Sequence, residues 1–349
     1  MEGNTMENNI VRAKEAYSKF GITYTAMNLV YYAAVLTVMM LFKLITKGDV
    51  ASSIFVQVAD YGIRFAIIYP VMYLLIRDIP KFDIEKKKLG IGGFIASAII
   101  AYTIMYISNV IGIALNSTIG KITGIGGVTP LIDALAQMPL ALQIVVVVIL
   151  APIFEELLFR KFLLDRVANF GEVPAMLLSG FMFGLYHANL SQFVYAFAIG
   201  CFFAFIYLRT GNIAYTIVLH MIINGASTFL TNKLLGGVDA GEMMSYLNNG
   251  DMEGYNRFIQ DNAAALAGTA IFGFIMIAVV IAGIVLMITL RKKFVFENHA
   301  EEIEKSERFG ATVLNIGMII YIVFYIAMIV SVQCGVDPFG SLASALGLY

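Results

Sequence analysis

Three groups of polar side chains stand out against an otherwise apolar sequence, and together they could hydrolyse an amide bond. The groups are Glu155, Glu156 and Arg160; Phe183 and His187; and His220 and Asn224. A carboxylate inside a membrane helix costs several kcal/mol, so such residues usually have a function. Carboxylate, imidazole and amide groups around one water can activate it and stabilise the oxyanion of an attacked carbonyl. The residue types therefore predict hydrolysis by an activated water, without a serine or cysteine nucleophile.

Helix geometry separates the two glutamates. Residues four apart on a helix differ by about 40° around its axis, so Glu156 and Arg160 can form an ion pair on one face. Glu155 is rotated by about 100° from Glu156 and has no cation close to it in sequence. We therefore expect Glu156 and Arg160 to have a structural role, and Glu155 to act as the general base.

Both histidines of the candidate site belong to helical pairs. Phe183 and His187 are four residues apart, as are His220 and Asn224, so each pair shares a helix face. We expect His187 to share the activated water with Glu155. His220 and Asn224 would donate hydrogen bonds to the oxyanion, and Phe183 would pack beside them. A single membrane histidine is commonly a packing residue bonded across helices, but three such groups in neighbouring segments favour a site.

The composition predicts a membrane protein. The chain is 60% hydrophobic and 13% charged, and its mean hydropathy is +0.83. A net charge of -1, without a basic patch interleaved with aromatic residues, argues against a nucleic-acid partner. Two cysteines, Cys201 and Cys334, are too few for a disulfide framework. We expect an all-α, polytopic transmembrane bundle whose surroundings are the lipid bilayer.

About nine segments are apolar enough to be membrane spans. They are Tyr24–Ile45, Ile54–Ile76, Leu89–Leu115, Leu140–Phe159, Pro174–Tyr186, Ser191–Leu208, Ile213–Leu230, Ala265–Leu290 and Ala311–Val332. Lysine and arginine gather after the second, fourth, sixth and eighth spans. The positive-inside rule then places the N-terminus in the cytoplasm and the C-terminus outside, in the plasma membrane if the protein is bacterial.

These features divide the chain into five parts. They are a cytoplasmic N-terminal segment (1–23), N-terminal transmembrane helices (24–139), the helices carrying the three polar groups (140–230), an external loop (231–264) and C-terminal transmembrane helices (265–349). The boundaries place His187 at the outer end of its helix and Glu155 toward the inner end of its own. A shared site therefore requires the His187 helix to be longer, or deeper, than these boundaries.

Two other polar features receive no catalytic role. Asp60 and Arg64 are four residues apart in the second span, so we expect them to pair with each other. His299 lies in the charged segment Phe296–Arg308, which we expect to be a surface helix in which this histidine is solvated.

The three polar groups resemble the motifs of the CPBP (Abi) family of intramembrane proteases, which includes the Ras-converting CAAX endopeptidase. The family's EExxxR, FxxxH and HxxxN motifs read here, in the same order, as Glu155-Glu156…Arg160, Phe183…His187 and His220…Asn224. The resemblance covers roughly Leu140 to Leu230. It implies an eight-helix-type protease core and an intramembrane endopeptidase that cleaves a membrane-bound peptide or protein tail. By motif position, Glu155 and His187 would activate water, His220 and Asn224 would stabilise the oxyanion, and Arg160 would hold the motif helix through Glu156.

Three alternatives remain open. Members of the family are described both as metalloproteases and as glutamate-dependent proteases, and Zn²⁺ would be held here by Glu155, His187 and His220. Because no HExxH motif is present, we favour an enzyme without a cofactor. A non-catalytic membrane scaffold or bacteriocin self-immunity protein of the same fold is a second alternative. A transporter is the third, although no inverted repeat is apparent.

Overall fold

The computed structural model describes residues 2–47, 54–123, 138–229, 240–299, 301–336 and 338–348, and every regular element within these ranges is a helix. Long apolar stretches favour helices because a helix satisfies its backbone hydrogen bonds within one segment. The predicted all-α membrane bundle is confirmed.

The N-terminal half begins with long helices. Its elements are α1 (Glu2–Thr46), α2 (Ile54–Ile63), the π-helical segment η1 (Arg64–Ile68), α3 (Tyr69–Ile76) and α4 (Gly90–Thr123). The polar N-terminal residues, expected as a separate segment, instead continue the helix of the first span. Ala13, Tyr17, Phe20 and Tyr24 are fully buried along one face, so tertiary packing extends this helix beyond its apolar part.

The central elements form two long helical stretches and two shorter ones. The first comprises α6 (Leu140–Gln143), η2 (Ile144–Leu150), α7 (Ala151–Glu156), η3 (Leu157–Phe162), α8 (Leu163–Val167) and the 3₁₀ turn η4 (Ala168–Phe170). It is followed by α9 (Glu172–Tyr186), α10 (Leu190–Thr210) and α11 (Ile213–Phe229). The fourth span was expected to end at Phe159, but the helical run continues to Phe170. Glu155 therefore lies near the middle of the run and not toward its end.

The C-terminal part contains one long helix that packs on α4 and a second that packs on α1. Its elements are α12 (Ala240–Asn248), α13 (Met252–Asp261), α14 (Ala263–Thr289), η6 (Arg291–Lys293), α15 (Lys305–Thr312), α16 (Ile316–Gln333) and α17 (Pro338–Ala345). Residues 231–239 of the expected external loop lie outside the described residues, and its later part forms α12 and α13. The ninth span begins at Ile316 and not at Ala311.

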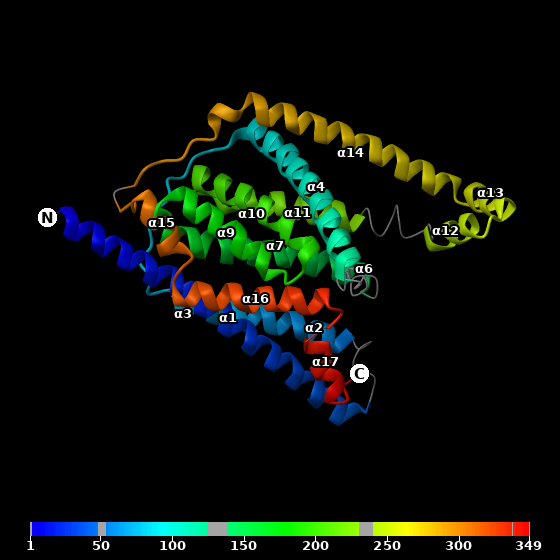
Figure 1. Ribbon diagram of the computed structural model, residues 1–349, viewed down its shortest axis with the longest axis horizontal. Helices are drawn as coiled ribbons and strands as arrows, with labels where there is room; N and C mark the ends of the chain where they lie inside the picture. Colours follow the sequence, from blue (N-terminus) through cyan, green and yellow to red (C-terminus); the bar gives the residue numbers. More distant parts are fainter. Residues whose placement is uncertain are drawn as a thin grey trace.

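The helices form successive layers (Figure 1). On one side, α1 packs against α16 and against α2 and α3. The central helices α7, α9, α10 and α11 follow, with α4 packed on α10. The outermost helix, α14, leans on α4 and carries α12 and α13 at its far end. This arrangement places the three helices that carry the polar groups in the centre of the bundle.

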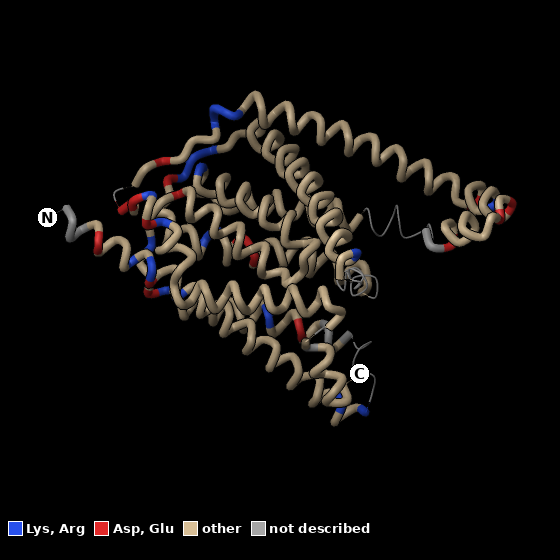
Figure 2. The backbone as a smooth tube through the Cα atoms, viewed as in Figure 1, with Lys and Arg blue, Asp and Glu red and all other residues tan. Residues whose placement is uncertain are grey.

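Within the residues that the structure describes, seven helical runs are long and apolar enough to cross a membrane, judged by length and composition. Two of the nine expected spans, α9 and α11, are shorter apolar helices of 15 and 17 residues. Charged residues gather at the end of the bundle where α1 begins, and few occur along the helices (Figure 2). We call this end the basic end, because the loop 77–89, Arg209 and Arg291–Lys293 lie there.

The segment between α14 and α15 is tied to the basic end. Residues 294–299 and 302–304 are irregular, whereas a surface helix was expected from Phe296. His299 is not solvated, because its Nε2 atom lies 3.2 Å from Oε1 of Glu172 and its ring packs on Phe82. The backbone N–H of Glu297 also donates to Glu172, over 2.8 Å. The start of α9 is thus held by a segment more than a hundred residues away.

Candidate active site

The helix that carries both glutamates contains two π-helical segments, η2 before them and η3 after them. Pro152, at the start of α7, has no N–H and cannot bond the carbonyl four residues before it. This missing bond accounts for the change of helical register in η2. Single π turns widen a helix locally and are frequent at functional sites.

Side chains from three other helices bond backbone carbonyls of these π segments. The donors are Asn224 to Val147 (2.9 Å), Tyr24 to Leu158 (2.8 Å) and Ser179 to Phe159 (2.6 Å). A π turn disturbs the regular pairing of carbonyls, so these donors satisfy acceptors that a buried backbone would otherwise leave unpaired. The glutamate helix is therefore fixed in its rotation by α1, α9 and α11.

Glu156 and Arg160 are both fully buried and form the ion pair that their spacing predicts. Nη1 of Arg160 lies 3.2 Å from Oε1 of Glu156. The guanidinium also donates from Nη2 to the carbonyl of Gly200, over 3.2 Å. Two buried opposite charges compensate each other's lost hydration only when they stay paired, so removing either one leaves an uncompensated charge.

His220 lies between the two glutamates. Its Nδ1 atom is 3.0 Å from Oε1 of Glu156, and its Nε2 atom is 3.7 Å from Oε2 of Glu155. Glu155 keeps 16% of its side-chain surface exposed, whereas Glu156 keeps none. Glu156 thus contacts a second residue besides Arg160, and the two carboxylates meet different nitrogens of the same imidazole.

Phe183 is the aromatic centre of the site. The guanidinium carbon of Arg160 lies 4.6 Å from its ring centroid. The rings of His187 and His220 approach it edge to face, at centroid distances of 4.8 and 5.8 Å. A cation over an aromatic face is attracted by the ring's quadrupole, most strongly when water is excluded. The sequence predicted only packing here, but Phe183 touches three of the polar residues.

His187 caps the C-terminal end of α9, and its Nδ1 atom lies 2.8 Å from the carbonyl oxygen of Phe183. A carbonyl oxygen only accepts, so the ring must carry its hydrogen on Nδ1. In the neutral ring, Nε2 then keeps its lone pair and can accept a proton. The helix ends immediately before His187. The expected pair, Phe183 and His187, is linked by this hydrogen bond from the His187 side chain to the Phe183 backbone.

Asn224 is partly buried on α11, one helical turn after His220. One N–H of its amide is occupied by the carbonyl of Val147, at 2.9 Å. An asparagine amide has two such hydrogens, so a second donor remains. The structure therefore joins Asn224 to the π segment before the glutamates, a contact that the sequence did not predict.

Helices α9 and α10 approach each other closely behind the site. A Cβ atom on Gly200 would lie 2.9 Å from the Cα atom of Gly180 and 3.1 Å from Cδ1 of Phe183. Small residues at such contacts let membrane helices pack backbone to backbone. The close approach brings the Gly200 carbonyl within reach of Arg160, so helix packing and the buried ion pair depend on each other.

The sequence did not predict that three tyrosines, Tyr69, Tyr186 and Tyr195, lie near the site. Tyr69 of α3 and Tyr195 of α10 lie within electrostatic range of Glu155. The hydroxyl of Tyr69 is 3.1 Å from that of Tyr186, and Tyr195 accepts from Gln192 over 3.0 Å. Nothing in their spacing separates these residues from the many aromatic residues that only pack in the core.

The three candidate zinc ligands do not form a metal-holding group. In the ranges that the structure describes, no three His, Cys, Asp or Glu side chains are grouped so as to hold a metal ion. Nδ1 of each site histidine bonds within the protein, to a carboxylate in His220 and to a carbonyl in His187. Metal-binding histidines commonly make such a bond with their second nitrogen, so only the spacing of the described side chains counts against a metal.

Comparisons with known proteins point to a family of membrane peptidases. The family described as "Type II CAAX prenyl endopeptidase Rce1-like" matches residues 137–226, which include all three motifs. The chain is 34% identical over 170 residues to "Putative membrane peptidase YdiL" of Bacillus subtilis (strain 168), covering 46% of this chain and 67% of that protein. It is 29% identical over 97 residues to "UPF0177 protein YxdF" of Lactococcus lactis subsp. lactis (strain IL1403), covering 28% of this chain and 54% of that one. No solved structure matches the chain.

Proposed function

The chain belongs to the Rce1-like family of type II CAAX prenyl endopeptidases, and from this premise we propose that it is an intramembrane endopeptidase that cleaves a membrane-bound peptide or protein tail. The family and the Bacillus relative support a membrane protease, and seven apolar helices support its place in the bilayer. The observation that carries the finer proposal is the position of His220 between Glu156 and Glu155.

Glu155 takes the proton from the attacking water. Its Oε2 atom is 3.7 Å from His220, which is too long for a hydrogen bond, and part of its surface is exposed. The water oxygen forms a bond to the carbonyl carbon while its proton passes to the carboxylate. When the C–N bond of the tetrahedral intermediate breaks, that proton is delivered to the leaving amine nitrogen.

His187 positions the same water. Its Nδ1 hydrogen is used by the Phe183 carbonyl, which leaves the lone pair on Nε2 to accept from the water's second hydrogen. This role is supported by the position of His187, which lies within electrostatic range of Glu155. A water bonded to both groups has its oxygen lone pair free for attack.

His220 and Asn224 stabilise the oxyanion. Glu156 holds the Nδ1 side of the His220 ring, and Nε2 faces the partly exposed side of Glu155, where the substrate oxygen would lie. Asn224 has a second N–H beyond the one used by Val147. Donors held in place before the reaction lose no energy to reorganisation when charge develops.

Glu156, Arg160 and Phe183 act as positioning residues. Arg160 holds Glu156 at 3.2 Å, and Glu156 in turn holds Nδ1 of His220 at 3.0 Å. Phe183 covers the guanidinium and both imidazole rings. The three residues fix the direction in which the His220 ring points and keep water away from the buried pair.

The direct test compares membranes that contain the wild type or Glu155→Gln and identifies, by mass spectrometry, the peptide that accumulates uncut. Loss of a general base should slow cleavage by roughly 10²- to 10⁴-fold. Glu253→Gln is a matched control, because Glu253 lies on α13 with an 86% exposed side chain. Equal cleavage by all three proteins would reject the enzyme and leave the scaffold or immunity function.

A chelator experiment tests the metal question separately. We expect purified protein to keep its activity after treatment with a strong chelator. Zn²⁺ bound by Glu155, His187 and His220 would supply a Lewis acid for the attacked carbonyl. Complete loss of activity that Zn²⁺ restores would therefore overturn the cofactor-free proposal.

We also propose that the basic end faces the cytoplasm, with the N-terminus inside and the C-terminus outside. The gathering of lysine and arginine at one end supports this orientation (Figure 2). The test labels single cysteines with a membrane-impermeant maleimide in intact cells, after both native cysteines are changed to serine. Asn249→Cys should react and Lys86→Cys should not; the opposite pattern would invert the topology.

A further inference from the structure

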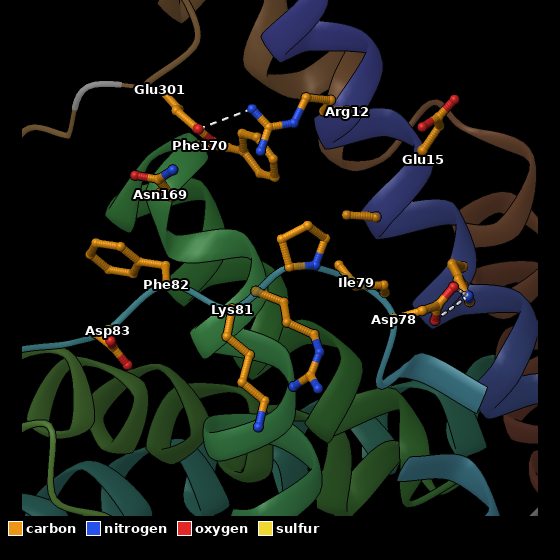
Figure 3. A pocket seen from close by; sticks show the side chains of 14 residues that line it. Arg12, Glu15, Asp78, Ile79, Lys81, Phe82, Asp83, Asn169, Phe170 and Glu301 are labelled. Carbon is orange, nitrogen blue, oxygen red and sulfur yellow. Dashed lines mark hydrogen bonds and ion pairs between the residues drawn. The ribbon is translucent and has the colours of Figure 1, made fainter. Parts of the chain in front are cut away.

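A cavity of about 630 Å³ lies at the basic end of the bundle, away from the site described above (Figure 3). Its walls come from α1, the loop that follows α3, the end of the glutamate helix and Glu301. The spans Val58–Ile76 and Leu140–Phe170 both end at this cavity, where the apolar part of the protein gives way to charged residues. The cavity therefore lies where lipid headgroups meet a bundle of this kind.

Half of the cavity's charged residues are paired with one another. Arg12 bonds Glu301 over 2.9 Å, and Lys19 bonds Asp78 over 2.5 Å (Figure 3). Two further acids, Glu15 and Asp83, are exposed and lie on opposite sides of the cavity in Figure 3. The two remaining cations of the cavity, Lys81 and Arg166, form no ion pair with a described residue.

Arg166 is buried but incompletely bonded. The residue keeps 2% of its surface exposed, although it lines the cavity. Its Nε and Nη1 atoms donate to the carbonyls of Ile76 (3.1 Å) and Phe162 (3.0 Å). Its Nη2 atom is buried and has no hydrogen-bond partner among the described residues. A buried guanidinium nitrogen without an acceptor is costly, so an acceptor from outside the chain would stabilise it.

Lys81 lies beside the same aromatic ring as Arg166. Its Nζ atom is 5.7 Å from the ring centroid of Tyr73, and the guanidinium carbon of Arg166 is 5.9 Å from that centroid. In the described part of the chain, neither cation has a carboxylate within ion-pair distance. Two cations next to one ring, with a cavity in front of them, are suited to hold an anion with several acceptor oxygens.

We propose that this cavity binds a phosphate group through Arg166 and Lys81, and that the phosphate belongs to the headgroup of an anionic phospholipid. Basic groups between membrane helices bind such headgroups, and here two cations that form no ion pair with a described residue lie where two spans end. The ligand would also hold the end of the helix that carries Glu155. The inference does not depend on proteolysis, because no residue of the proposed active site lines the cavity.

The test measures lipid binding to the purified full-length protein in uncharged detergent, by native mass spectrometry and by the shift of the thermal unfolding midpoint. The probes are phosphatidic acid, phosphatidylcholine and inorganic phosphate. Wild type should bind phosphatidic acid more tightly than phosphatidylcholine. Lys81→Gln should weaken that binding by roughly tenfold, the effect of one lost charged hydrogen bond.

Lys86→Gln is the matched control, because Lys86 is exposed in the same loop and does not line the cavity. Arg166→Gln should weaken binding further, but its backbone bonds make Lys81→Gln the safer variant. Equal affinity of Lys81→Gln and Lys86→Gln, or of both lipids, would overturn the proposal. Stabilisation by inorganic phosphate alone, lost in Lys81→Gln, would keep the anion site and assign it to a soluble phosphate. Glu155→Gln should retain lipid binding, which separates this inference from the proposed protease.

Discussion

Nδ1 of His220 lies 3.0 Å from Oε1 of Glu156, while Nε2 of the same ring faces Glu155 at 3.7 Å. The imidazole therefore links a carboxylate that is fully buried to one that is partly exposed. Substituting each of the two adjacent glutamates should therefore change the stability of the protein to a different extent.

Glu156→Gln should destabilise the protein by about 3–5 kcal/mol, because Arg160 would remain buried without its counter-charge. Glu155→Gln should change stability little, because the Glu155 carboxylate is partly exposed and lies 3.7 Å from its partner His220. Thermal unfolding of the two purified variants in the same detergent makes the comparison. Equal stability of both variants would contradict the division between a positioning and a reacting glutamate.

Phe183→Leu should lower the rate of cleavage by roughly tenfold or more, because a shift of the groups it covers spoils the reacting geometry. The substitution removes the ring beside Arg160, His187 and His220. Phe181→Leu is the control on the same helix, since Phe181 contacts only the rings of Phe193 and Phe197 among the described aromatic pairs. A similar loss of rate in both variants would indicate general packing damage in α9.

Asn224→Ala should reduce both cleavage and stability. The Val147 carbonyl would lose its donor, at a cost of about 1–3 kcal/mol, and the oxyanion would lose one of its donors. Asn262→Ala removes a similar bond, to the Phe258 carbonyl over 2.9 Å, far from the site. Only the Asn224 variant should lose rate after correction for the folded fraction; unchanged kcat would remove Asn224 from the oxyanion site.

Gly200→Ala should destabilise the bundle by about 1–3 kcal/mol, since the added methyl group would meet the backbone of Gly180 and the ring of Phe183. Gly273→Ala, on α14, has open space around it and should be neutral or slightly stabilising. Unfolding midpoints of the two variants test the prediction. A neutral Gly200→Ala would mean that α9 and α10 are farther apart than described.

The stability of the basic end should fall in acid. The hydrogen bond from Lys87 holds the pKa of Glu297 below its usual value. A carboxylate with a lowered pKa in the folded state stabilises the protein above its unfolded pKa, and that contribution disappears as the pH falls through the folded pKa. The effect should be small, because the side chain of Glu297 is 51% exposed. Unfolding midpoints from about pH 6 to about pH 3 should decline less steeply in Glu297→Gln than in Glu307→Gln.

Helical spacing predicted those contacts of the site whose two residues lie on the same helix. The Glu156–Arg160 pair follows from a four-residue spacing, and hydrophobicity and length located the apolar helices. The link between Glu156 and His220 joins residues 64 positions apart, so no helical periodicity could show it. The contact between Asn224 and Val147 depends on a π segment whose only local signal is Pro152.

Tertiary contacts also changed two expectations from sequence, one pairing and one solvated side chain. Asp60 and Arg64 were expected to pair directly, but Tyr31 lies between them, donating to Asp60 and accepting from Arg64. His299 was expected in solvent and instead bonds Glu172. In both cases a residue distant in sequence supplies the contact: Tyr31 of α1 for Asp60 and Arg64, and Glu172 of α9 for His299. Spacing alone cannot reveal such partners.

The two π segments have a consequence for how this helix can tolerate change. Because η2 and η3 bound α7 on both sides, the six residues Ala151–Glu156 have a rotational setting of their own, separate from either end of the run. A π turn holds one more residue than an α turn, so deleting one residue from η2 converts it to an ordinary α turn and leaves the glutamates facing nearly the same way. Deleting one residue of α7 before Glu155 rotates both glutamates by about 100° relative to the preceding helix. The first deletion should therefore preserve the direction of Glu155 better than the second.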